Sequence, residues 1–235
     1  MVKIDTVYQT VLALANKEQR GYITPQEFNL FAIQAQMQIF EQYFYDLNQF
    51  LRAPGNNTSH SDMVDLLEEK ISFFERTGAA VGGGTQLPED LYKLQQVKWT
   101  EFGQGNNNQT YDVEYVSQKT YTKMRRVSLI KPTDERLVYI RNAFSIAVVG
   151  KEQKTIGVTC NYIKAPENPS WTYVVVGEKA LFNPDGGAVD FELHHSEQTE
   201  LVTRILGLAG ITLKDQSLYQ IASNEESKQI QQQKR

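Results

Sequence analysis

The sequence predicts an α+β fold with three parts: an N-terminal antiparallel helical bundle, a central antiparallel β-sandwich or barrel-like domain, and C-terminal helices that continue into an extended arm. Three observations support this prediction. Apolar residues recur every three or four positions up to about residue 77, which is the period of an amphipathic helix. Short apolar runs then alternate with clusters of turn residues up to residue 193, as in antiparallel sheets. After residue 193 the helical period returns.

Three helices are expected at the N-terminus, and the second has the strongest local signal in the chain. Thr24 can cap this helix, Pro25 suits its first position, and Glu27 can close a capping box. The helix should run over 25–52. A first helix precedes it, and a third is expected over 62–76. Short connections between the three predict an antiparallel bundle.

The second helix carries aromatic side chains on more than one face. They can form a core stripe against neighbouring helices of the same chain. Alternatively, one aromatic flank is buried only against another subunit, since aromatic residues are enriched at the centres of obligate interfaces. We take Phe40, Tyr43, Phe44 and Tyr45 as the candidate interface residues of this helix.

The middle of the chain opens with a glycine-rich run at 78–85, which lacks the GxxxxGK[ST] pattern of a phosphate-binding loop. We expect a hinge there, followed by a short helix or turn near Pro88. Strands are then expected at 95–101, 111–117, 123–130, 137–140, 145–149, 155–163, 173–176 and 189–193.

One predicted strand is locally basic. Lys119, Tyr121, Lys123 and Arg125 would lie on one side of it. Basic residues interleaved with an aromatic ring can contact nucleic acid. A solvated edge strand, on which lysines block aggregation, is the alternative.

The composition and motifs argue against several functions. The 235 residues carry a net charge of −4, whereas a dedicated nucleic-acid binder needs a concentrated positive surface. We expect the single cysteine, Cys160, to be a small buried apolar residue within a strand. His194 and His195 would point to opposite faces of a strand, which is poor geometry for a metal, and Ser196 reads as a helix cap. We therefore expect no enzyme activity, no metal and no cofactor. No apolar run reaches the roughly 20 residues of a membrane span.

The C-terminal residues are almost wholly polar and cannot bury enough surface to fold alone. This tail is either frayed in solution or ordered by a partner as a docking arm, and we take Leu218, Ile221 and Ile230 as the candidate interface residues of the arm. The predicted domains are 1–77, a helical bundle; 78–93, a hinge and short helix; 94–193, an antiparallel β domain; and 194–235, a C-terminal helix and docking arm.

Several stretches resemble virion proteins of tailed bacteriophages, including crAss-like phages and marine podoviruses. They are NKEQRGYITPQEF at 16–28, CNYIKAP followed by PSW at 160–171, and the run from DFEL to LAGI at 190–211. The resemblance implies a structural protein of the virion, assembled in the host bacterial cytoplasm, that forms a connector or adaptor ring at the head–tail junction. The implied partners are copies of itself in a homo-oligomeric ring, a dodecamer in the family, and the portal or a neighbouring tail ring. DNA would pass through the lumen without sequence-specific binding.

Two other functions remain open at the level of sequence. A head-decoration or fibre-associated module that binds carbohydrate would be favoured by Trp99 or Trp171 exposed on a shallow β surface. An enzyme would be favoured by a deep pocket that holds two carboxylates or a histidine with a shifted pKa.

Overall fold

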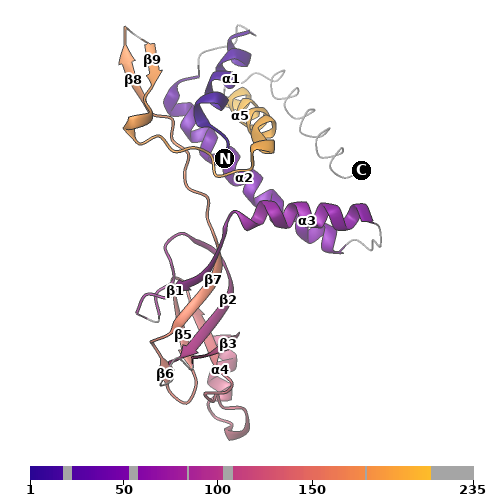
Figure 1. Cartoon of the computed structure of the whole chain (residues 1–235), viewed down its shortest axis with the longest axis vertical. Coiled ribbons are helices and arrows are strands. Elements are labelled where there is room, and N and C mark those ends of the chain that lie inside the picture. Colours follow the sequence, from indigo (N-terminus) through magenta and orange to yellow (C-terminus); the bar gives the residue numbers. More distant parts are fainter. Residues whose placement is uncertain (18–22, 53–57, 84, 103–107, 178, 213–235) are drawn as a thin grey trace. The chain divides into compact units, whose positions relative to one another are not determined.

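The computed structural model of the chain (Figure 1) describes residues 1–17, 23–52, 58–83, 85–102, 108–177 and 179–212. The fold is mixed α+β, as the sequence predicts. It divides into two compact units. The helical unit is built from Met1–Phe73 and Pro166–Arg235, and the sheet unit is the continuous segment Phe74–Ala165.

The described residues of the helical unit form helices from both ends of the chain and one β-hairpin. These elements are α1 (Ile4–Lys17), α2 (Pro25–Arg52), α3 (Thr58–Ser72), β8 (Tyr173–Val176), β9 (Lys179–Phe182), η2 (Pro184–Gly186), η3 (His195–Glu197) and α5 (Gln198–Thr212). α2 packs against α3 and α5, and α1 packs against α5. The fully buried side chains come from all parts of this unit, Phe28, Phe191 and Leu201 among them. The two ends of the chain therefore share one core.

The start of α2 has the capping box that the sequence predicts. The backbone N–H of Glu27 donates to Thr24 Oγ1 at 3.3 Å, and the backbone N–H of Thr24 donates to Glu27 Oε2 at 3.0 Å. These hydrogen bonds satisfy two of the backbone donors that a helix start leaves free. The hydrogen bonds from Thr24 lower the pKa of the Glu27 carboxyl. Both predicted ends of this helix, Pro25 and Arg52, are confirmed.

The segment 166–193 returns from the sheet unit and is fixed onto α2 by side-chain amides. Gln36 donates to the carbonyl of Glu167 at 2.7 Å and accepts from the N–H of Glu192 at 3.0 Å. Asn29 pairs with both backbone groups of Trp171, at 3.1 and 2.8 Å. Each amide uses one N–H donor and its oxygen acceptor to bond the backbone of this segment, as a partner strand would.

The sheet unit holds a curled seven-stranded sheet with the spatial order β1-β7-β2-β3-β4-β5-β6. Its strands are β1 (Glu75–Ala80), β2 (Leu91–Glu101), β3 (Gln109–Tyr115), β4 (Val138–Asn142), β5 (Ser145–Val149), β6 (Gln153–Lys154) and β7 (Val158–Lys164). Every neighbouring pair is antiparallel except β3 and β4. A parallel pair needs a crossover connection. Here α4 (Gln118–Met124) and η1 (Ser128–Ile130) lie in that connection.

Several sequence-based expectations for the middle of the chain are wrong. The predicted basic strand at 123–130 is α4 and η1, because Ser117 caps a helix by accepting from the N–H of Thr120. The predicted strand at 189–193 makes only single bridges, Val189 with Ser170 and Phe191 with Val2. The glycine-rich run is not a free hinge, since its first residues belong to β1.

The observed boundary between the units also differs from the predicted β domain at 94–193. The sheet unit begins at Phe74 and ends at Ala165. β8 and β9 pair with each other and lie in the helical unit, so they add no second layer to the seven-stranded sheet.

Candidate functional site

The four candidate interface residues on α2 have very different surroundings. Phe40 and Tyr43 are buried in their own chain, with 0% and 5% of their surface exposed. Phe44 is half-buried, and its ring packs edge-on against Phe40 with 5.0 Å between the centroids. Tyr45 is 66% exposed. Within this group, Tyr45 therefore offers the largest free surface to a partner.

The candidate interface residues of the C-terminal arm, Leu218, Ile221 and Ile230, lie outside the described residues. The structure places the other residues that the sequence singles out. Trp99 and Trp171 are 7% and 1% exposed, so neither ring offers a face on which a sugar could stack. Cys160 is buried in β7, where burial and the nearby charge of Asp90 raise the pKa of its thiol.

A buried charged cluster lies where α2, α3 and α5 meet. Lys70 Nζ is 2.6 Å from Glu197 Oε1 and 5.4 Å from the centre of the Tyr43 ring. Arg204 forms an ion pair with Glu200 at 2.6 Å. Burial, together with the charges of Glu197 and Glu200, raises the pKa of the Tyr43 hydroxyl. Each described charge in this cluster has an opposite partner, which suits a group that holds helices together.

Sequence reasoning missed this cluster. Glu197 and Glu200 fit the sequence equally well as solvated acidic residues in the first turn of a helix. Their partners, Lys70 and Arg204, come from α3 and α5. Lys70 and Glu197 are 127 residues apart, so no local pattern in the sequence indicates that they pair. The structure shows the contact and the small exposed fractions of the two side chains, 23% and 5%.

Of the two adjacent histidines, His194 makes the local contacts of a helix cap. His194 Nδ1 lies 2.8 Å from Ser196 Oγ and also accepts from the Ser196 N–H at 3.4 Å, which caps η3. Ser196 itself lies within η3, so it is not the residue that caps α5. Within the described ranges, no group of three or more His, Cys, Asp or Glu side chains could hold a metal ion.

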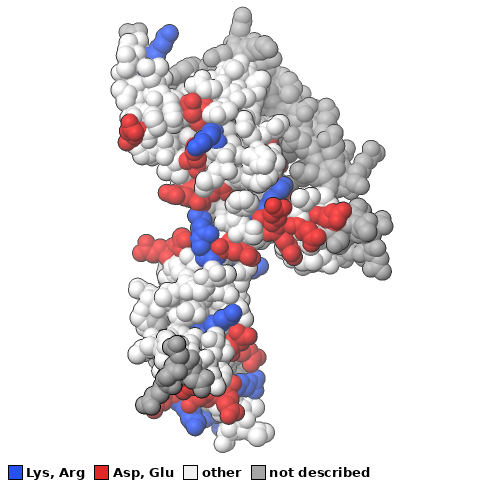
Figure 2. Space-filling view, viewed as in Figure 1, with Lys and Arg blue, Asp and Glu red and all other residues white. Residues whose placement is uncertain are grey.

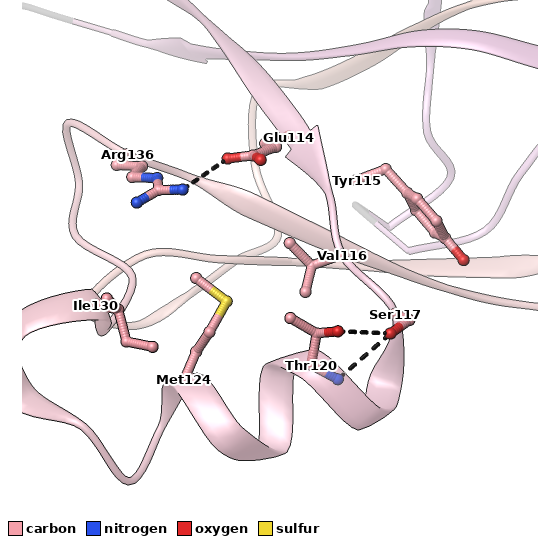
Figure 3. A pocket seen from close by; sticks show the side chains of 8 residues that line it. All are labelled: Glu114, Tyr115, Val116, Ser117, Thr120, Met124, Ile130 and Arg136. Carbon is pink, nitrogen blue, oxygen red and sulfur yellow. Dashed lines mark hydrogen bonds and ion pairs between the residues drawn. The ribbon is translucent and has the colours of Figure 1, made fainter.

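An open cavity of about 390 Å³ lies beside α4 in the sheet unit (Figure 3). Val116, Met124 and Ile130 are among the apolar side chains that line it. At one side Arg136 pairs with Glu114 at 3.1 Å, and both side chains are 58% exposed. The lining contains no histidine or cysteine, and its ion pair is solvated. We therefore assign no catalytic chemistry to this cavity.

The hairpin of β8 and β9 exposes several apolar side chains, which we call the hairpin surface. They belong to a sheet of two strands. The exposed fractions lie between 36% and 63% for Tyr173, Val174, Val175, Val176 and Leu181. At the base of the hairpin, the rings of Tyr173 and Phe182 stack on Trp171 with centroids 5.8 Å away.

Comparisons with known proteins add no identification. No family model matches the chain, and no curated protein matches it. Among the helices that the structure describes, none combines the length and apolar character needed to cross a membrane.

Proposed function

We propose that this chain is a structural virion protein that forms an oligomeric connector or adaptor ring at the head–tail junction of a tailed bacteriophage. In this role the ring attaches the tail and guides DNA through its lumen. One observation of the structure supports an assembly role above all others: the hairpin surface presents a run of exposed apolar side chains, and among the described residues no further strand pairs with β8 or β9.

An isolated two-stranded hairpin is marginally stable in water. Here the rings of Tyr173 and Phe182 stack on Trp171 and hold the base of the hairpin, so the rest of the hairpin can extend from the helical unit. Contiguous exposed apolar side chains mark surfaces that bind another protein. The strand edges beyond the β8–β9 pairing also offer backbone donors and acceptors, to which a neighbouring chain can add a strand.

The gain from covering the hairpin surface is large enough to matter for assembly. Complete burial of a valine or leucine side chain contributes roughly 1.5–3 kcal/mol. Val174, Val175, Val176 and Leu181 are each about half exposed, so each would contribute about 1 kcal/mol in a contact. A contribution of about 1.4 kcal/mol changes an affinity tenfold.

The bacteriophage assignment rests on the sequence resemblance described above. Closed rings form through heterologous interfaces, in which one surface of a subunit meets a different surface of the next. A chain with two compact units can supply those two surfaces from separate units.

The proposal is tested by the mass of the purified protein, measured alone and with purified portal rings, with negative-stain images of any particle. We expect a closed ring, or assembly triggered by the portal. The double variant Val174→Ser/Val176→Ser should weaken assembly without unfolding the chain, because both residues are exposed. Leu30→Ser removes an equally exposed apolar side chain from α2 and is the matched control. A protein that stays monomeric and never joins portal rings would contradict the proposal.

A further inference from the structure

A strongly basic segment connects β3 to β4. Residues 118–131, which we call the basic segment, contain α4 and η1 and no acidic residue. Five of the 24 lysine and arginine residues of the chain lie here, and all five are exposed: Lys119, Lys123, Arg125, Arg126 and Lys131. The rest of the chain is correspondingly acidic, since the net charge of the whole is −4.

The cations of the basic segment are available for a partner. None of the five has an ion pair with another described residue. Apolar side chains lie among them: Leu129 is 92% exposed and Val127 is 47% exposed. A surface that mixes positive charge with exposed leucine and valine suits a partner that offers both carboxylates and apolar contact.

A complementary surface lies on α3 of the same protein. Asp62, Asp65, Leu66 and Glu69 occupy positions i, i+3, i+4 and i+7, so they share one face of the helix. We call them the acidic stripe. The four side chains are exposed, and Leu66 is 50% exposed. On the opposite face, Leu67 is buried in the helical unit. Figure 2 shows acidic side chains gathered over α3.

The carboxylates of the acidic stripe also lack a described partner. Asp62, Asp65 and Glu69 form no ion pair with any residue that the structure describes. Acidic residues three and four positions apart repel one another mildly on an isolated helix. A positive partner relieves that repulsion, and this makes the acidic stripe a suitable target for the basic segment.

We propose that the basic segment of one copy docks on the acidic stripe of the next copy. This inference rests on the proposed function, because it assigns two surfaces of the ring interface. The charges are opposite, and each surface carries an exposed leucine, Leu129 on one side and Leu66 on the other. The two surfaces belong to different units, so the contact is heterologous and can repeat around a ring.

Duplex DNA is the other polyanion that the basic segment could meet. The phosphate backbone attracts lysine and arginine but offers no apolar partner for Leu129, the most exposed large apolar side chain of the described chain. The acidic stripe offers both kinds of contact. A second copy of this chain therefore fits the basic segment better than DNA does.

The test uses charge reversal on the full chain. We expect Lys119→Glu/Lys123→Glu/Arg126→Glu to weaken ring assembly by at least about tenfold at low salt, since attraction becomes repulsion at the interface. Asp62→Lys/Asp65→Lys/Glu69→Lys should weaken assembly to a similar degree. The control for the first variant, Lys93→Glu/Arg141→Glu/Lys151→Glu, makes the same change of net charge as that variant at exposed sites outside both surfaces. It should assemble like the wild type.

Mixing the two reversed proteins in equal amounts is the decisive measurement. Each then carries the surface that the other needs, so rings should return, and a contact within one chain could not produce this rescue. If the wild type forms rings and both reversed variants form them equally well, the inference is overturned but the proposed function stands. A wild type that forms no ring with or without portals would contradict the proposed function itself. If the basic-segment variant loses duplex DNA binding in a gel-shift assay but assembles like the wild type, the inference is overturned and the basic segment binds DNA instead.

Discussion

Tyr162 shows at the scale of one residue how the sheet unit combines burial with a specific polar contact. Its hydroxyl donates to Asp90 Oδ1 at 2.9 Å. Burial, this hydrogen bond and the negative charge of Asp90 raise the pKa of Tyr162 from 10.0 to about 12. The folded protein therefore keeps a proton that the unfolded chain releases above pH 10.

This shift predicts a pH dependence of stability. The contribution of Tyr162 to the free energy of unfolding is complete below pH 10 and is lost as the pH rises through about 12. Tyr162→Phe should cost about 1 kcal/mol near pH 8, because it removes one hydrogen bond, and the cost should shrink by pH 11. Urea unfolding of both proteins at several pH values measures the difference. A cost that stays constant up to pH 11 would show that the pKa of Tyr162 is not raised.

Gly157 is a second position where one residue type is required. Its φ is +76°, and a Cβ atom there would overlap the carbonyl oxygen of Thr100. That carbonyl belongs to the strand residue whose N–H donates to the Gly157 carbonyl at 2.8 Å, so it cannot move away freely.

We expect Gly157→Ala to destabilise the sheet unit by about 2 kcal/mol or more, since backbone strain and overlap add together. Gly78→Ala is the matched control. Its φ is +67°, but nothing lies within 4 Å of the added Cβ, so only the backbone strain of about 1 kcal/mol applies. Thermal unfolding of the two variants measures the difference. Equal losses of stability would mean that the Thr100 contact carries no cost.

Contacts at this scale were predictable only where they are local in sequence. The capping box joins Thr24 to Glu27, three positions apart, and its pattern is visible in the sequence. The hydrogen bond between Tyr162 and Asp90 spans 72 positions. Nothing near either residue indicates the other, because strand pairing in the folded sheet brings them together.

At the scale of elements, one buried amide fixes the return segment onto α2. Gln36 is 2% exposed and bonds both the carbonyl of Glu167 and the N–H of Glu192. Gln36→Leu would remove the hydrogen bonds to both backbone groups, which are part-buried. We expect a loss of about 2–4 kcal/mol in the free energy of unfolding. Gln34→Leu makes the same substitution at an exposed position of α2 and should cost little. Chemical denaturation checks the pair, and an equal effect would contradict the role of Gln36.

The elements also show where sequence periodicity misleads. The alternation of lysine, tyrosine and arginine from Lys119 to Arg125 fits a strand with one basic side. Ser117, two residues earlier, caps a helix instead, and only Met124 of that helix is buried. Residues 173–176 are a strand as predicted. The apolar run at 189–193 is not, because its backbone bonds single residues of distant segments.

The candidate interface on α2 illustrates the same limit. Its aromatic residues fit the sequence equally well as a core stripe or as a contact with another subunit. Burial of Phe40 and Tyr43 depends on α3 and α5, and α5 lies far along the chain. The hairpin surface, by contrast, lies mostly in the strand at 173–176 that the sequence predicts, whereas Leu181 belongs to β9, which the sequence does not predict. The exposure of this surface was not predictable, because a run of valines is typical of a buried strand.

At the scale of the whole molecule, the path of the chain explains why the predicted domain boundaries differ from the observed units. The chain leaves the helical unit after Phe73 and re-enters it at Pro166. A sequence-based boundary follows the change from strand to helix pattern, which falls near residue 193. The structural boundary follows the hydrogen bonds of Asn29 and Gln36 to the return segment, and these are long-range.

This path predicts that the two units differ in their ability to fold as fragments. The sheet unit is one continuous segment with its own core, which includes Val97, Trp99 and Val148. Residues 74–165 expressed alone should therefore unfold cooperatively. Residues 1–73 alone should not, because their core is completed by Trp171, Phe191 and α5 from the C-terminal part. Circular dichroism and thermal melts of the two fragments measure this. Adding a 166–235 fragment to 1–73 should restore helical structure, whereas a 1–73 fragment that melts cooperatively by itself would show that the N-terminal helices already hold a complete core.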